Sequence, residues 1–65
     1  MGNYETRLEM ARRHVADQER LIAAQRETIS GLERAGQATE LAEKMLQLME
    51  GKLASLRADL AQLAN

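Results

Sequence analysis

The chain has 65 residues, with nine basic and ten acidic side chains and no cysteine, proline, phenylalanine or tryptophan. Disulfides and thiolate metal sites are excluded, and the single histidine does not form a zinc site by itself. The net charge of −1 gives no strong field toward nucleic acid or an anionic membrane. Good helix formers (Ala, Leu, Glu, Arg and Gln) dominate, which favours an all-α protein.

Size adds a second expectation. A chain this short buries only about 60% of the surface that its unfolded form exposes. Small domains are therefore usually stabilised by disulfides, a metal or a second copy of themselves. The first two have no support here, so we expect self-association.

A first helix is predicted over about residues 3–34. Two sets of positions, each repeating every seven residues, alternate three and four apart, which is the seam of a coiled coil. The sets are Leu8, Val15, Ile22, Ile29 and Tyr4, Ala11, Gln18, Gln25, Leu32.

A turn is predicted over about residues 35–38, because the seam pattern loses phase there. Gly36 can adopt the left-handed conformation that ends a helix, and Arg34 places a cation at the negative end of the helix dipole. Thr39 offers its hydroxyl as the N-cap of the next helix, with Glu40 and Glu43 in the first turn.

A second helix is predicted over about residues 39–64. A short connection between two long helices gives an antiparallel two-helix hairpin, coiled-coil-like, in a single domain spanning residues 1–65. The expected intrachain seam, besides the edge positions Ala11 and Ala42, is Val15, Gln18, Ile22, Gln25, Ile29, Leu32, Leu46, Met49, Leu53, Leu56, Leu60 and Leu63.

The two stripes predict one register. Ile22 faces Leu53, Gln18 faces Leu56 and Ala11 faces Leu63. In this register residues 1–9 would extend beyond the second helix, so Tyr4 and Leu8 would have no neighbour within the chain.

The flanks of the seam carry further apolar residues, among them Met10, so each helix needs more than one neighbour. We therefore expect a homodimer that forms a four-helix bundle, with a hetero-partner helix as the alternative. The candidate oligomer or partner interface is Tyr4, Leu8, His14, Leu21, Leu41, Met45 and Leu48.

Five residues on the helices leave alternatives open. Gln18 and Gln25 either reach water at the edge of the seam or bond to symmetry mates and set the register. Gly31 and Gly51 either are substitutions that the helices tolerate by chance or, in the case of Gly51, allow a close approach of the backbone opposite Ala23 and Ala24. His14 is interpreted as a helix-flank residue, with a pH switch as the alternative.

Catalytic chemistry is not indicated. No serine has a suitably spaced histidine, no glycine-rich phosphate motif occurs, and we expect neither enzyme activity nor a catalytic, cofactor or metal site. Carboxylates at salt-bridge spacing, such as Glu9 with Arg13 and Glu40 with Lys44, indicate a solvated helix face.

Nucleic acid is the competing class of partner. The first helix carries six arginines, which would suit a small RNA-binding regulator, but six carboxylates on or beside the same helix balance them. Aromatic residues for base stacking are also missing beyond Tyr4. No apolar run approaches the ~20 residues that span a bilayer, so we expect no membrane partner and a cytoplasmic location.

The stretch from His14 to Arg57 resembles a group of short alphaproteobacterial proteins, common in rhizobia and their relatives. The likeness rests on His14-Val15-Ala16-Asp17-Gln18-Glu19-Arg20, Gln25-Arg26, Leu32-Glu33-Arg34-Ala35-Gly36 and Leu53-Ala54-Ser55-Leu56-Arg57. It implies a bacterial cytoplasmic helical hairpin and assigns no activity to any residue. A structural or protein-interaction module is accordingly the function that we expect.

Overall fold

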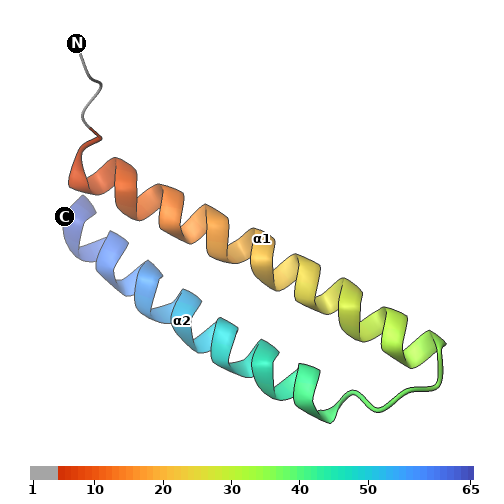
Figure 1. Cartoon of the computed structure of the whole chain (residues 1–65). Coiled ribbons are helices and arrows are strands. Elements are labelled where there is room, and N and C mark those ends of the chain that lie inside the picture. The colour runs from red at the N-terminus through yellow and green to blue at the C-terminus, as the bar shows by residue number, and fades with distance from the viewer. Residues whose placement is uncertain (1–4) are drawn as a thin grey trace.

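A computed structural model describes residues 5–65 and contains two helices, α1 (Arg7–Arg34) and α2 (Glu40–Ala64). They lie side by side and run in opposite directions, joined by one short turn (Figure 1). The prediction of an all-helical hairpin is confirmed. The molecule measures 51 × 27 × 12 Å, so the two helices form a single layer.

The start of α1 is fixed by a capping box. The Thr6 hydroxyl accepts a hydrogen bond from the backbone N–H of Glu9 (3.0 Å), and the Glu9 carboxylate accepts one from the backbone N–H of Thr6 (2.9 Å). These bonds satisfy N–H groups that the first helical turn leaves free. The helix therefore begins at Arg7. The predicted start at about residue 3 is wrong for residues 5 and 6, which precede the helix.

The end of α1 and the turn follow the prediction. Gly36 has φ of 70°, and its N–H donates to the Glu33 carbonyl (3.0 Å) while the Gln37 N–H donates to the Leu32 carbonyl (2.9 Å). This pair of bonds is a Schellman motif, which closes the last carbonyls of a helix around one left-handed residue. Arg34 lies in the final turn, as expected from the dipole.

Thr39 corrects a prediction. It is the N-cap residue of α2 by position, but its side chain makes no capping hydrogen bond. Its backbone has φ of −116° and ψ of −3° rather than the extended conformation that aims an N-cap hydroxyl at the first turn. The carbonyl of Thr39 instead accepts from the Glu43 N–H at 2.9 Å, which begins the helix by backbone bonding alone.

The core is the predicted seam between the helices. Ile22 and Ile29 are buried, and the other apolar seam residues are half-buried except Leu63, which is 39% exposed at the end of α2. Predicted facing pairs such as Ile22 with Leu53 line common grooves. The seam therefore holds the hairpin together, but it fully covers few of its own side chains.

Two expectations about the ends and the glycines are corrected. The last turn of α2 reaches the first turn of α1 (Figure 1), and Leu8 is half-buried, so the expected overhang is not seen from Arg7 onward. Tyr4 lies outside the described residues. A Cβ added at Gly51 would meet nothing within 4 Å, which excludes a close approach to Ala23 or Ala24.

Candidate interaction surface

Two glutamines of α1 bond across the seam to the backbone of α2. The side-chain amide nitrogen of Gln18 donates to the Met49 carbonyl, and that of Gln25 donates to the Ala42 carbonyl, both at 2.9 Å. The second bond is the first one shifted by one heptad on each helix, in opposite directions. A mid-helix carbonyl can accept both its helical bond and a side-chain bond, because it has two lone pairs.

These contacts correct the interpretation of Gln18. It is 4% exposed, so it does not reach water at the edge of the seam. The Nε2 groups of Gln18 and Gln25 donate to carbonyls of the same chain, not to a symmetry mate. Any effect of these glutamines on register is therefore on the register of α1 against α2 within one hairpin. Sequence patterns gave no signal for this bond, because the acceptor is a backbone atom.

Two ion pairs between the helices repeat at the same heptad offset. Arg57 contacts Glu19 at 2.9 Å, and Arg26 contacts Glu50 at 3.0 Å. All four side chains line one groove on one side of the hairpin, here called the charged face. Residues seven apart lie on the same side of a helix, so both ion pairs lie on the same side of the hairpin.

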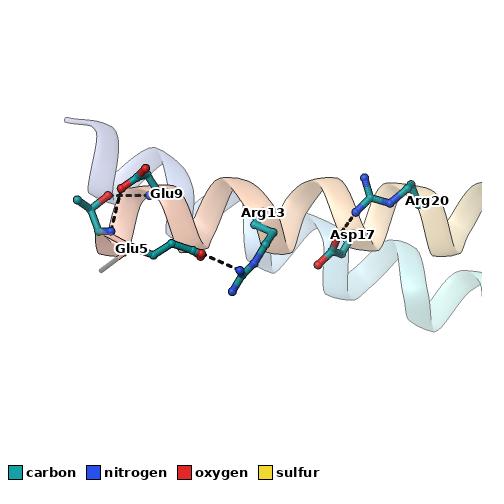
Figure 2. A network of polar contacts seen from close by, with 6 residues as sticks. Glu5, Glu9, Arg13, Asp17 and Arg20 are labelled. Carbon is teal, nitrogen blue, oxygen red and sulfur yellow. Dashed lines mark hydrogen bonds and ion pairs between the residues drawn. The ribbon is translucent and has the colours of Figure 1, made fainter. Parts of the chain in front are cut away.

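The ion pairs along the first helix and the residues just before it differ from those predicted. Figure 2 shows Arg13 with Glu5 (2.7 Å) and Arg20 with Asp17, while Glu9 takes part in the cap at Thr6. The expected pair of Glu9 with Arg13 is therefore wrong, because the capping box uses the Glu9 carboxylate. Among residues 5–65, Glu40 and Lys44 form no ion pair either.

The cap also lowers the pKa of the Glu9 carboxyl. The main cause is the hydrogen bond from the backbone N–H of Thr6, followed by that from the Thr6 side chain. Both favour the ionised carboxylate. The effect is local to the start of α1 and does not mark a catalytic group.

The side opposite the charged face is apolar. Among residues 5–65, six large apolar side chains are exposed, and the 100° step of the helix places all of them on this side. We call them the apolar face: Met10, Leu21, Leu41, Met45, Leu48 and Leu63. Two grooves on this side share His14 and Leu56, and neither shares a residue with the groove on the charged face.

The predicted interface residues that can be placed belong largely to this surface. Leu41 and Leu48 are 73% and 76% exposed, Leu21 is 55% and Met45 is 48%. His14 is exposed beside Met10 and Leu63 in one groove, whereas Leu8 is half-buried in the hairpin. Folding therefore brings together residues from both helices that were recognised separately in the sequence.

Other kinds of site find no support in the described part of the chain. Residues 5–65 contain no group of three or more His, Cys, Asp or Glu side chains placed to hold a metal ion. In the same residues neither helix combines the length and the apolar character needed to cross a bilayer. Comparisons of the chain with protein-family models, with curated proteins and with solved structures find no match.

Proposed function

We propose that the chain is a structural or protein-interaction module that acts as a homo-oligomer, in which two hairpins pack their apolar faces together into a four-helix bundle. The observation that carries the proposal is the separation of the two faces. Both interhelical ion pairs lie on one side, and the six exposed large apolar side chains lie on the other. Scattered surface leucines are ordinary in proteins, whereas large exposed apolar side chains gathered on one side mark an interaction site.

The exposed area supports a second copy as the occupant. The chain exposes 5204 Å², whereas a compact monomer of 7.3 kDa exposes about 4200 Å². The difference, about 1000 Å² by this scaling, is of the same order as the roughly 800 Å² that each partner buries in a standard interface. A single layer of two helices also lacks the second layer around which domains normally build a core.

Self-association also agrees with the energetics of the face. Each large apolar side chain contributes about 1.5–3 kcal/mol when it passes from water to a packed interior. Burial of several such side chains is therefore comparable to the total stability of a small domain.

The alternative partners have weaker support. An RNA-binding regulator would use the arginines of α1, yet Arg13, Arg20 and Arg26 are engaged by carboxylates of the same chain. A helix from an unrelated protein would dock on Leu41, Met45 and Leu48. A cytoplasmic location and kinship with the alphaproteobacterial group belong to the same proposal and rest on the sequence features that suggested them.

Light scattering on a size-exclusion column, across a dilution series, tests the proposal. We expect twice the 7.3 kDa chain mass, persisting to low micromolar concentration. Leu48→Lys should shift the protein toward monomer. Gln47→Lys introduces the same charge at the neighbouring exposed position, away from the apolar face, and should leave the mass unchanged. A wild-type chain that stays monomeric at high concentration would contradict self-association.

A further inference from the structure

The half of the apolar face near the turn pairs large residues on one helix with small residues on the other. On α2 it carries Leu41, Met45 and Leu48, at spacings of four and three. On α1 the same side carries Ala24, Thr28 and Gly31, also at spacings of four and three. The face is thus a ridge beside a trough.

Contacts across the seam place the ridge and the trough at the same level. Gln25 and Arg26 reach Ala42 and Glu50, so this turn of α1 lies level with the part of α2 between those residues. Met45 and Leu48 are in that part. Ala24 and Thr28 flank the same turn of α1.

The trough is apolar as well as shallow. The Thr28 hydroxyl donates to the Ala24 carbonyl at 3.1 Å, so it is bonded within α1 and needs no partner across an interface. A Cβ added at Gly31 would meet only the far end of the Arg34 side chain, at 3.9 Å. The Gly31 position is therefore open except for that flexible side chain, and Ala24 and Thr28 are exposed to side chains from another molecule.

We propose, on the basis of the self-association proposed above, that two copies pack with their turns at the same end. The two-fold axis then runs along the length of the bundle, and each α1 lies over α2 of the second copy. The ridge of one copy (Leu41, Met45, Leu48) fills the trough of the other (Ala24, Thr28, Gly31). Because the contact is isologous, the fit is made twice.

The charges in the middle of the face agree with this arrangement. Asp17 and Lys52 line one groove there with Leu21. With the turns together, Asp17 of one copy, which also pairs with Arg20 of its own helix, approaches Lys52 of the other, so opposite charges meet.

Packing with the turns at opposite ends has the reverse effect. It places α2 over α2, and Lys52 then meets Lys52 of the second copy near the axis. The ridge residues Met45 and Leu48 would lie over Asp59 and Ser55, so apolar side chains would meet polar ones. Like charges and mismatched surfaces both oppose association.

Spin labels at the turn distinguish the two arrangements. The chain has no cysteine, so Gln37→Cys, at an exposed position, provides one attachment point per copy. Double electron–electron resonance on the dimer should give a distance of roughly 20–30 Å, two to three helix diameters. A distance near the 51 Å length of the hairpin would overturn the proposed packing while leaving self-association intact. A chain shown by light scattering to be monomeric would overturn both.

A filled trough provides the second test. Ala24→Leu should weaken the dimer at least tenfold, because its side chain occupies the space for the ridge. Ala23→Leu is the control, because Ala23 lines the groove on the charged face. Equal dimer affinity for the two variants, with both still helical by circular dichroism, would contradict the ridge and trough.

Discussion

The side-chain amide of Gln18 donates to the backbone carbonyl of Met49 at 2.9 Å, and the residue that makes this bond is only 4% exposed. A buried polar group is stable only when it is hydrogen-bonded. Gln18 therefore ties one position of α1 to one position of α2. Gln25 repeats the bond one heptad away at Ala42, so the pair resists a shift of register.

The first prediction concerns this bond. Gln18→Glu keeps the shape but replaces the donor with a carboxylate that faces a carbonyl oxygen. We expect a loss of roughly 1–3 kcal/mol at pH 7, measured by urea denaturation at one protein concentration. The pKa of the new carboxyl should be raised in the folded state. Stability should therefore recover as the pH falls through this raised pKa, and the recovery should be complete below about 4.3, where the unfolded chain is protonated as well.

Gln25→Glu is the matched control, because Gln25 makes the same bond from a half-buried position. Its effect should have the same sign and be smaller. Equal stability of Gln18→Glu and wild type at pH 7 would show that the hydrogen bond from Gln18 to Met49 does not stabilise the register of the two helices.

The second prediction contrasts two glycines. Gly51→Ala should raise the stability by about 1 kcal/mol, because glycine is a poor helix former and the added methyl group meets nothing within 4 Å. Gly36→Ala should lower it by a similar amount, about 1 kcal/mol, because φ is 70° there. The melting temperature should rise by about 5 °C in Gly51→Ala and fall by about 5 °C in Gly36→Ala. A loss of stability in Gly51→Ala would indicate a contact that the hairpin does not contain.

The third prediction extends the ion pairs of the charged face. One heptad beyond Arg26 and Glu50, the same relation joins Glu33 to Glu43, which are like charges. Glu33→Lys should therefore add about 0.2–1 kcal/mol, and its position in the last turn of α1 also suits a cation.

Salt and a control variant separate this effect from a general change in net charge. The gain from Glu33→Lys should shrink as sodium chloride is raised, since exposed pairs are screened. Glu27→Lys changes the net charge equally at an exposed position of α1 that is outside the heptad series of Glu19, Arg26 and Glu33. If both variants gain equally, the pairing with Glu43 is wrong.

The fourth prediction concerns the capping box. Thr6→Ala should cost about 1 kcal/mol and fray the first turn of α1. The cap holds the pKa of Glu9 below its ordinary value, so its contribution is present above the unfolded pKa and is lost as the pH falls through the folded one. The difference between Thr6→Ala and wild type should therefore narrow in acid. Hydrogen exchange of the Glu9 amide measures the cap directly, because this N–H donates to the Thr6 hydroxyl. Unchanged protection of this amide in Thr6→Ala would contradict the capping hydrogen bond.

The sequence by itself determined the two helices, the turn and the seam. Heptad spacing and a phase break depend only on residue order, and Gly36 is the one residue at the break that adopts positive φ without strain. The start of α1 was also readable, since Thr6 and Glu9 have capping-box spacing. The apolar pattern alone predicts an earlier start, because it extends further toward the N-terminus.

Tertiary structure decided what the residue pattern leaves open. The acceptors of Gln18 and Gln25 are backbone carbonyls of α2, which every residue possesses, so no side-chain pattern could identify them. The ion pairs join residues 24 and 38 positions apart, and only the packed helices bring them onto one face. The same packing leaves Leu41, Met45 and Leu48 exposed, because a helix in a single layer has only one neighbour to bury its apolar side chains against.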